Sequence, residues 1–368
     1  MRILQIYPKN DYFTGAAVQL WELSQELRRR GHEVVIATRP SPEWDQRCRE
    51  AGVPHYALPM RSEVDLASAR ALVGILRAHG IDIVHAHKGK GRTLALLAGL
   101  FVTIPVLILN RGVSFPLGRL QRLGYTTRRV TAIIAVCEAI KRALVASGVP
   151  PGKIEVIYSG TDTQRFRLGT DGASVRRALD FGAKDVVFTQ IGVRSWKGND
   201  DAIDAMVWLT AKAPQARLLI VGARNPETLL ERVRRKRLAD VVRVIGYRTD
   251  IPEILAASNC CVDVSYAGLG VTGTLREALA VGTPVIATDL EGNPELVVHG
   301  TTGLLVPPRR PEALARAMLD IINDPVAACR MALAGHQRVN TEFSTARKVE
   351  RTESLYRRLL SRPSRSDG

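Results

Sequence analysis

The chain has 368 residues, of which 46% are hydrophobic and 24% are charged; this is the composition of a soluble globular protein long enough for two domains. No apolar run reaches the length of about 18 residues that a membrane-spanning helix requires, so we expect no such helix. The formal net charge is +16, but aromatic residues make up only 5% and no zinc-ligand or helix-turn-helix spacing occurs. We therefore do not expect a nucleic-acid partner.

Cysteine usage indicates the compartment. The 5 cysteines include no Cys-x-x-Cys pair, and Cys260 and Cys261 stand next to each other in an apolar segment. This pattern predicts buried free thiols in a reducing compartment. The opening residues lack the length and the cleavage pattern of a signal peptide. We expect a cytoplasmic protein, either free or peripheral on the inner face of the cell membrane.

Strand and helix patterns alternate from the first residues onward. The first series is expected to have strands at 2–7, 33–38, 83–86, 106–109 and 132–136, with helices at 17–30, 65–79 and 93–101. After the turn signal at 150–152, a second series is expected to have strands at 186–191, 217–221, 241–245, 260–265 and 284–288, with helices at 200–210, 226–236, 251–257 and from 274. Alternation of this kind predicts parallel sheets that are covered by helices on both faces. The predicted fold class is therefore α/β, with two doubly wound sheets in succession.

The stretch 262–295 combines a buried strand, a glycine-rich turn, a helix and a second apolar strand. Such a turn offers free backbone N–H groups and the positive end of a helix dipole, which together suit a phosphate or a diphosphate. The spacing Gly268-x-Gly270-x-x-Gly273 matches the dinucleotide-binding fingerprint, and Asp289 follows where a ribose-binding acid is expected. One interpretation is therefore an NAD(P)-dependent oxidoreductase.

A longer pattern over the same stretch resembles the family-4 retaining glycosyltransferases of the GT-B fold. The family signature has a glutamate, a glycine pair, a second glutamate eight positions after the first, then Ala-x-Gly-x-Pro-Val and Gly-x-x-Glu. The matching residues here are Gly268, Gly270, Glu277, Ala280, Gly282, Pro284, Val285, Gly292 and Glu295, followed by the sequence GLLVP from Gly303. Leu269 departs from the signature, because it stands where the family has its first glutamate. Since leucine accepts no hydrogen bond from a sugar hydroxyl, we expect either altered discrimination among donor sugars or a catalytically weak nucleotide-sugar-binding relative.

The resemblance implies two Rossmann-like domains that face each other across a cleft. Residues 1–165 would form the acceptor-side domain and residues 166–344 the donor domain. A helix at 345–360 would cross back to the first domain, and the tail 361–368 would be disordered. The implied reaction is retaining transfer of a sugar from a nucleotide diphosphate sugar to an acceptor hydroxyl, in the synthesis of cell-envelope glycolipid, lipopolysaccharide or polysaccharide.

The candidate site residues stand at the ends of predicted strands, where ligands bind in such sheets. Arg194 and Lys197 flank the turn after strand 186–191 and supply the two positive charges that a diphosphate requires. The resemblance assigns both as catalytic residues, together with His87, which would contact the transferred sugar, and Glu277, which would hold the ribose. The expected donor-binding set is Gly15, Gly192, Tyr247, Arg248, Gly270, Val271, Thr272, Gly273 and Glu277. Because no Asp-x-Asp motif occurs, we expect neither a metal nor a further cofactor.

The positive charge is concentrated in the first half of the chain. Residues 1–170 carry 24 Lys or Arg against 13 Asp or Glu, and no acidic residue stands between Asp82 and Glu138. One interpretation is an ordinary solvated basic face; the other is a surface for an anionic glycolipid or glycan acceptor, or for an anionic membrane. The candidate contact residues in this segment are Lys88, Lys90, Arg92, Arg111, Arg119, Arg122, Arg128 and Arg129.

Overall fold

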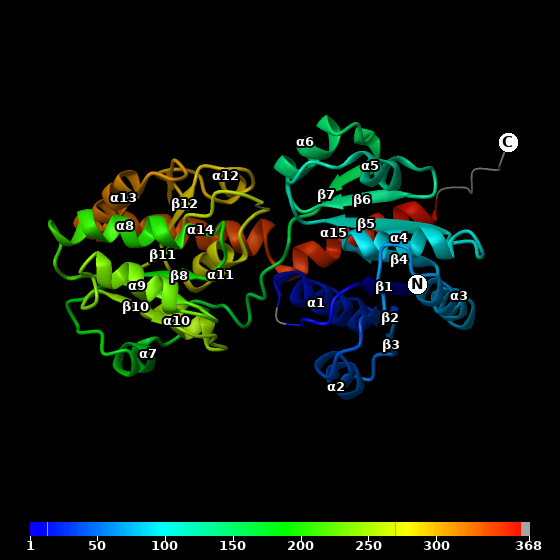
Figure 1. Cartoon of the computed structure of the whole chain (residues 1–368), viewed down its shortest axis with the longest axis horizontal. Coiled ribbons are helices and arrows are strands. Elements are labelled where there is room, and N and C mark those ends of the chain that lie inside the picture. The colour runs from blue at the N-terminus through cyan, green and yellow to red at the C-terminus, as the bar shows by residue number, and fades with distance from the viewer. Residues whose placement is uncertain (13, 269, 362–368) are drawn as a thin grey trace. The chain divides into compact units, whose positions relative to one another are not determined.

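The computed structural model describes residues 1–12, 14–268 and 270–361. The expectations placed on Leu269 and on the tail beyond residue 361 therefore fall outside the described residues. The chain divides into two compact units, one containing Met1–Gly160 and the segment from Thr345, the other containing Thr161–Ser344 (Figure 1). The expected domain border at 165/166 lies a few residues beyond this division.

The first unit is built on a seven-stranded parallel sheet with the order β3-β2-β1-β4-β5-β6-β7. Its strands are β1 (Arg2–Tyr7), β2 (Glu33–Thr38), β3 (His55–Ala57), β4 (Ile83–His87), β5 (Val106–Arg111), β6 (Ala132–Ala135) and β7 (Ile154–Val156). Its helices are α1 (Gly15–Arg29), α2 (Pro42–Glu50), α3 (Leu66–His79), α4 (Lys88–Ala98), α5 (Arg119–Thr126), α6 (Glu138–Ala146), the 3₁₀ turn η1 (Pro151–Lys153) and α15 (Thr345–Leu360).

The second unit is built on a six-stranded parallel sheet with the order β10-β9-β8-β11-β12-β13. Its strands are β8 (Val186–Ile191), β9 (Ala216–Val221), β10 (Val242–Ile245), β11 (Cys260–Asp263), β12 (Val285–Thr288) and β13 (Leu304–Val306). Its helices are α7 (Ala173–Ala178), α8 (Asn199–Thr210), α9 (Glu227–Arg235), α10 (Ile251–Ala257), α11 (Gly273–Val281), α12 (Asn293–Leu296), α13 (Pro311–Asn323) and α14 (Pro325–Glu342).

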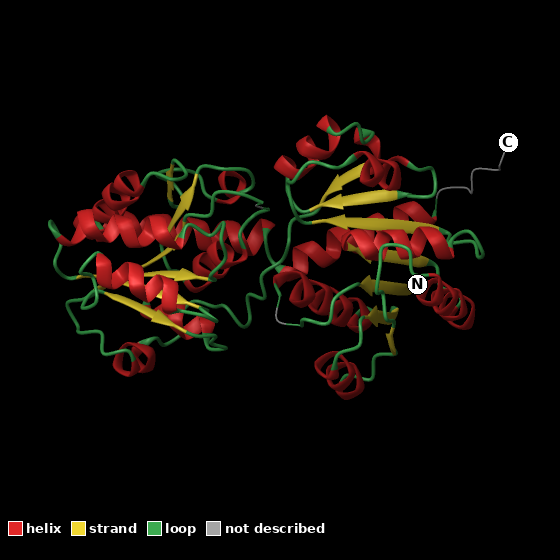
Figure 2. Ribbon diagram, in the orientation of Figure 1, coloured by secondary structure: helices red, strands yellow, loops and turns green. Residues whose placement is uncertain are grey.

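Helices cover both faces of each sheet, which confirms the predicted α/β class with two doubly wound sheets (Figure 2). The strands are buried on both faces because helices pack on each side, so β6 and β12 are nearly continuous apolar runs. In the first unit, α15 contributes Val349, Leu355 and Tyr356 to the same apolar core as the residues of α1. The C-terminal helix is thus part of the first unit's core.

Helix α4 begins earlier than the sequence pattern predicted. The expected helix was 93–101, whereas α4 spans Lys88–Ala98. The glycines of the segment Lys88-Gly-Lys-Gly read as a loop, but Gly91 stands where a Cβ would lie only 3.4 Å from Ile6. The small residue therefore lets the first turn of α4 pack closely against β1, and this packing outweighs the low helix propensity of glycine.

Tyr356 on α15 fixes a buried hydrogen bond in the first unit. Its hydroxyl lies 2.6 Å from Nδ1 of His85, and both side chains are buried. Burial lowers the pKa of His85 to about 3, so the imidazole is neutral at pH 7. We expect Tyr356→Phe to lower the free energy of unfolding by about 1–3 kcal/mol, because it leaves a buried ring nitrogen without its partner.

A second tyrosine–histidine pair provides the matched control. Tyr56 Oη lies 2.7 Å from Nε2 of His79, but both side chains are only half-buried, so water can replace the lost hydroxyl. Urea unfolding of the two Tyr→Phe variants should therefore show the smaller loss for Tyr56→Phe. Equal losses would contradict this account of the His85 contact.

Candidate active site

The turn that follows β8 is shaped by two glycines with positive φ. Gly192 has φ +93° and Gly198 has φ +67°, and a Cβ on Gly198 would lie 2.3 Å from the carbonyl oxygen of Val264. Only glycine allows the turn to lie this close to the segment after β11. Two hydrogen bonds from Tyr266 hold the turn there, one from its amide to Trp196 O at 2.9 Å and one from its hydroxyl to Ser195 O.

This turn presents Arg194 and Lys197 in different ways. The Arg194 side chain is exposed, and its Nη1 donates only to the neighbouring carbonyl oxygen of Val193. Lys197 is half-buried, and its Nζ lies 2.5 Å from Oδ2 of Asp263 at the end of β11. The sequence predicted the two cations together; in the structure Arg194 is exposed on the surface and Lys197 is held by a buried carboxylate.

Asp263 is a site residue that the sequence interpretation missed. Its side chain is only 1% exposed, and its second oxygen, Oδ1, accepts hydrogen bonds from the amide and the hydroxyl of Ser265. A buried carboxylate is tolerated only when it is paired and hydrogen-bonded, and Lys197 supplies the pairing charge. A lone aspartate inside the apolar run of β11, at the carboxyl end of a strand, is the signal that could have identified it.

The glycine-rich turn after β11 leads into α11, which begins at Gly273, one residue before the expected start. Thr272 precedes the helix, and its side chain makes no capping hydrogen bond to the amides of the first turn. Gly292, in the segment after β12, packs closely against this turn. A Cβ added at Gly292 would lie 2.6 Å from the carbonyl carbon of Gly270. The predicted donor-binding residues Gly270, Val271, Thr272 and Gly273 are thus packed against a second backbone segment.

A chain of buried hydrogen bonds holds the glycine-rich turn in place. Asn293 is fully buried, and its Oδ1 accepts from Thr272 Oγ1 at 3.0 Å while its Nδ2 donates to Thr288 O at 3.2 Å. Thr288 Oγ1 in turn donates to Ser265 O at 2.6 Å. The chain links the ends of β11 and β12 to the start of α11, so the geometry of the glycine-rich turn is held before any ligand binds.

Glu277 lies one turn into α11, half-buried, on the same strand edge as Lys197. Burial raises the pKa of its carboxyl group above the ordinary value of 4.5, while the nearby charges of Arg276, Arg165 and Lys197 lower it. A Cβ added at Gly273 would lie 3.9 Å from Oε1 of Glu277, so this carboxyl group lies against the start of the helix. The second unit therefore brings together the predicted residues Lys197 and Glu277 with the glycine-rich turn.

The raised pKa of Glu277 predicts how the free energy of unfolding depends on pH. Because burial disfavours the ionised form in the folded chain, wild type loses stability as pH rises through the unfolded-state pKa near 4.5. We expect Glu277→Gln to raise the free energy of unfolding at pH 7 and to lose this advantage as the pH falls to 4.5 and below. Urea titrations of both chains across this range would measure it, and an advantage that grows in acid would refute it.

The predicted donor-binding residues Tyr247 and Arg248 lie just after the end of β10. Tyr247 is 62% exposed. Arg248 is paired with Asp250, with its Nε donating to Oδ1 at 2.7 Å, and this pairing lowers the pKa of the Asp250 carboxyl group. Tyr247 is therefore largely exposed after β10, whereas the guanidinium of Arg248 is held against Asp250.

Two predicted site residues belong to the first unit. Gly15 starts α1 with no atom within 4 Å of a would-be Cβ, and Thr14 caps that helix. His87 ends β4 and is only 5% exposed. Its Nδ1 lies 3.3 Å from the amide nitrogen of Asn110, and its Nε2 lies 2.8 Å from Oε1 of Gln5. Asn110 donates to Nδ1, so the ring proton is on Nε2; burial holds the pKa of His87 well below 6.5.

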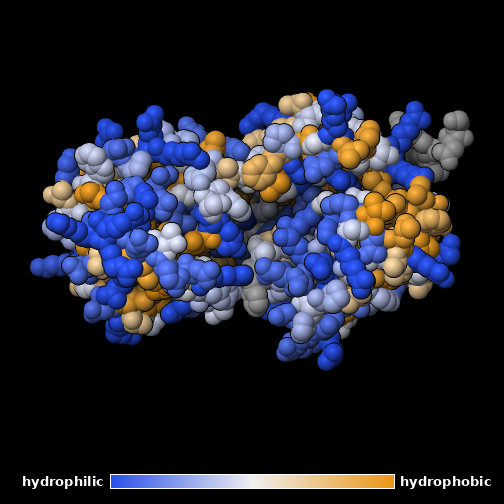
Figure 3. Space-filling model, in the orientation of Figure 1, coloured by the Kyte–Doolittle hydropathy of each residue, from blue (hydrophilic) through white to orange (hydrophobic). Residues whose placement is uncertain are grey.

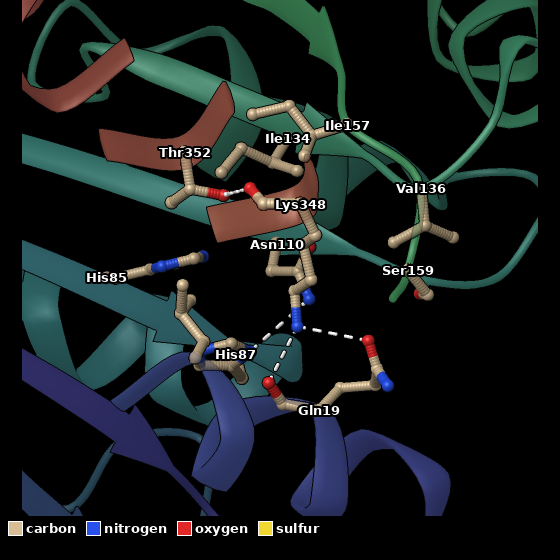
Figure 4. Close-up of a pocket in the computed structure, with 11 residues that line it drawn as sticks. Gln19, His85, His87, Asn110, Ile134, Val136, Ile157, Ser159, Lys348 and Thr352 are labelled. Atoms are coloured by element: carbon tan, nitrogen blue, oxygen red, sulfur yellow. Dashed lines mark hydrogen bonds between the residues drawn. The ribbon is translucent and has the colours of Figure 1, made fainter. Parts of the chain in front are cut away.

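His87 lines a small cavity of about 20 Å³, enough for about one water molecule (Figure 4). In Figure 4, Lys348 extends from α15 to Gln19 on α1, where its Nζ donates to the backbone oxygen at 2.6 Å and to the amide oxygen at 3.0 Å. Gln5 and Asn110, which fix the His87 ring, were not predicted; Asn110 stands at a strand end, which was the available signal. The contact of His87 with a sugar stays a prediction.

The eight basic residues of the acid-free segment do not share one surface. Arg92 is buried, with its guanidinium 5.1 Å from the ring centroid of Tyr125. Lys88 lies 5.8 Å from the ring of Tyr7, Lys90 donates to the carbonyl oxygen of Arg61, and Arg111 donates to that of Phe115. Five of the eight are exposed, namely Lys88, Arg119, Arg122, Arg128 and Arg129. The four exposed arginines lie on α5 and the turn after it, whereas Lys88 stands at the start of α4.

Among the described residues, no group of three or more His, Cys, Asp or Glu side chains is placed to hold a metal ion. Within that same part of the chain, no helix is both long and apolar enough to span a membrane.

Two successive Rossmann-like domains, the second with a cationic, glycine-rich strand edge, define the architecture of GT-B glycosyltransferases. The Anabaena protein Alr3699/HepE, solved in complex with UDP, superimposes with a TM-score of 0.87 at 20% identity and covers 97% of this chain and 100% of that one. Residues 13–165 match the family described as Glycosyltransferase Family 4, and residues 183–324 match Glycosyl transferases group 1.

Two relatives extend the comparison. The D-inositol 3-phosphate glycosyltransferase of Rhodococcus jostii is 30% identical over 84% of this chain and 77% of that protein. The GDP-mannose-dependent monoacylated alpha-(1-6)-phosphatidylinositol monomannoside mannosyltransferase of Corynebacterium glutamicum is 29% identical over 78% of this chain and 79% of that protein. The chain therefore belongs to the family-4, group 1 glycosyltransferases. Membership of this family favours the transferase over the oxidoreductase interpretation of the three-glycine pattern.

Proposed function

We propose that the protein transfers a sugar, with retention of anomeric configuration and without a metal ion, from a nucleotide diphosphate sugar to an acceptor hydroxyl. The observation that carries the proposal is the strand edge of the second unit. There Lys197 is held by Asp263, Arg194 is exposed three residues earlier, and α11 starts after the glycine-rich turn without a capping hydrogen bond from Thr272. These groups supply two cations and a row of backbone N–H donors, which match the charge of a diphosphate.

In the proposed reaction, the bond between the anomeric carbon and the diphosphate oxygen breaks as the bond to the acceptor oxygen forms on the same face of the sugar. The proton of the acceptor hydroxyl passes to the departing diphosphate. Negative charge grows on the leaving group, so Lys197, Arg194 and the α11 amides stabilise the transition state more than the ground state. Glu277 binds the ribose hydroxyls, and Tyr247 stacks on the base.

The acceptor in this proposal is anionic, either a phosphorylated glycolipid or a glycan of the cell envelope. The names of both relatives include a phosphate-bearing inositol acceptor. The first unit carries the exposed arginines of α5 and the turn after it, and a positive surface raises the local concentration of anionic acceptors. The enzyme would then work in the cytoplasm at the inner face of the cell membrane.

A thermal-shift panel of UDP, GDP, ADP and NAD, with EDTA in every sample, tests the proposal. A ligand that binds only the folded chain and is present at about 100 times its dissociation constant adds about 2.7 kcal/mol of stability. We expect one nucleoside diphosphate to raise the melting temperature and NAD to leave it unchanged. Stabilisation by NAD alone would favour the oxidoreductase instead.

A further inference from the structure

Helix α5 and the segments on either side of it present apolar and basic side chains together on the surface of the first unit. We define the α5 surface as Phe115, Arg119, Leu120, Arg122, Leu123, Arg128 and Arg129. Leu120 is 84% exposed, Leu123 is 63% exposed and Phe115 is 52% exposed. The two leucines are three positions apart in a helix, so they lie on the same side of it. Figure 3 shows apolar and hydrophilic residues next to each other over this part of the molecule.

The exposure of these side chains follows from how α5 is anchored. Its buried side carries Tyr125, only 3% exposed, with the guanidinium of Arg92 over its ring. Gly124 leaves room for that arginine, since a Cβ there would lie 2.7 Å from Arg92 Nε. At the end of the helix, Lys153 Nζ donates to the carbonyl oxygens of Thr126 and Thr127, at 3.3 and 2.8 Å.

The anchoring turns the opposite side of the helix toward solvent. None of Phe115, Leu120 and Leu123 belongs to the apolar core of the first unit. Their exposure is therefore a feature of the folded unit, and it carries a hydrophobic cost in water that a partner surface would remove.

The charge around these apolar side chains has one sign. Arg119, Arg122, Arg128 and Arg129 are exposed, and no acidic residue occurs between Asp82 and Glu138. A polyanion in solution would engage the arginines but leave the leucines in water. A bilayer with anionic headgroups can bind both kinds of side chain. Arginines pair with lipid phosphates, while leucine and phenylalanine enter the boundary of the acyl chains.

We propose that the α5 surface docks the enzyme on an anionic phospholipid bilayer. The proposal rests on the proposed glycolipid acceptor for its biological purpose, since docking would bring the first unit to a membrane-embedded substrate. The docking itself is a property of side chains outside the nucleotide-binding edge. Lipid binding and nucleotide binding are therefore separable by measurement.

The test is sedimentation of the full chain with vesicles of phosphatidylcholine alone or of phosphatidylcholine mixed with phosphatidylglycerol. Wild type should sediment with the anionic vesicles only. The double variant Leu120→Ser with Leu123→Ser should weaken this partition by tenfold or more. The double variant Arg119→Gln with Arg122→Gln should also weaken it by tenfold or more, because each arginine at an anionic surface contributes about fivefold. Added salt should weaken wild-type binding strongly, because it screens the arginines.

Matched controls come from the second unit. Trp208 is 57% exposed on α8, a helix that also carries Asp200, Asp201 and Asp204, so Trp208→Ser removes an exposed apolar side chain outside the α5 surface. Arg234→Gln with Arg235→Gln removes two exposed charges from α9. Each control should change vesicle partition by less than twofold. Because every substituted side chain is exposed, all variants should keep the wild-type melting temperature.

Three results would overturn the proposal. They are equal sedimentation with both vesicle types, no binding at low salt, and an equal loss in the α9 control. If the arginine pair but not the leucine pair lowered binding, and heparin or single-stranded DNA bound as tightly as the vesicles, the surface would be a polyanion site instead. Nucleotide thermal shifts on the same variants should match wild type, so failure of lipid docking would leave the proposed transferase chemistry intact.

Discussion

Lys197→Ala is expected to abolish nucleoside diphosphate binding and to reduce turnover by about 10²- to 10³-fold, the loss seen when one preorganised charge-stabilising donor is removed. It should also destabilise the fold. The lysine Nζ lies 2.5 Å from Oδ2 of Asp263, whose side chain is 1% exposed. Removing the lysine leaves that carboxylate buried without its pairing charge, which costs about 3 kcal/mol. The pairing could not be read from the sequence, because Lys197 and Asp263 stand 66 residues apart.

The double variant Lys197→Ala with Asp263→Asn separates the two effects. The amide removes the stranded charge, so urea unfolding should show that much of the lost stability returns, while nucleotide binding stays absent. Arg194→Ala is the second comparison, because its side chain is exposed and bonds only to a neighbouring carbonyl oxygen. It should weaken diphosphate binding about tenfold or more and leave stability unchanged. Full nucleotide affinity in both the Lys197 and Arg194 variants would refute the assigned diphosphate site.

Gly292→Ala is expected to weaken nucleotide binding without removing any charged group. Gly292 has an ordinary φ of −84°, so alanine is allowed by the backbone itself. The methyl group, however, would lie 2.6 Å from Gly270 C, 2.8 Å from Gly270 O and 2.8 Å from Val271 N. These are backbone atoms, so one of the two segments must move. We expect the glycine-rich turn to shift and nucleotide affinity to fall at least tenfold, because misplaced binding groups lose their contribution.

The control for Gly292 is a glycine with free space around it. Gly74 lies inside α3 with no atom within 4 Å of a would-be Cβ. Gly74→Ala should raise the free energy of unfolding by about 0.5–1 kcal/mol through helix propensity and leave nucleotide binding unchanged. Nucleotide titrations of the two Gly→Ala variants would therefore differ sharply. Wild-type affinity in Gly292→Ala would show that this turn does not contact the ligand.

Much of the fold could be predicted from the sequence because parallel α/β units have a strong local pattern. Strand 186–191 and helices 251–257 and 345–360 have the predicted bounds, since apolar runs and helical periodicity mark them directly. Helix α4 was placed too late because the packing of Gly91 on β1 is a tertiary contact that propensity does not contain. Helices α13 and α14 follow the motif region and were not named, although their periodicity was present.

The candidate site was predictable only in part, and for a physical reason. Arg194, Lys197 and Glu277 stand in local motifs at strand ends, so their positions could be read from the chain. Asp263 and Asn293 act through partners that are distant in sequence, namely Lys197 and Thr272. Pairings of this kind depend on which strands are neighbours, and the order β8-β11-β12 appears only in the folded sheet.

The most direct test of retaining, metal-independent transfer follows the anomeric configuration of the released sugar. The chain would be incubated in EDTA with an α-linked nucleotide diphosphate sugar carrying the base selected by thermal shift, and hydrolysis to water would be monitored by proton NMR. Retention predicts that the α-anomer appears first and that mutarotation then produces the β-anomer. Lys197→Ala should release the sugar about 10²- to 10³-fold more slowly than wild type. Initial release of the β-anomer, or activity that EDTA removes and a divalent cation restores, would contradict the proposed reaction.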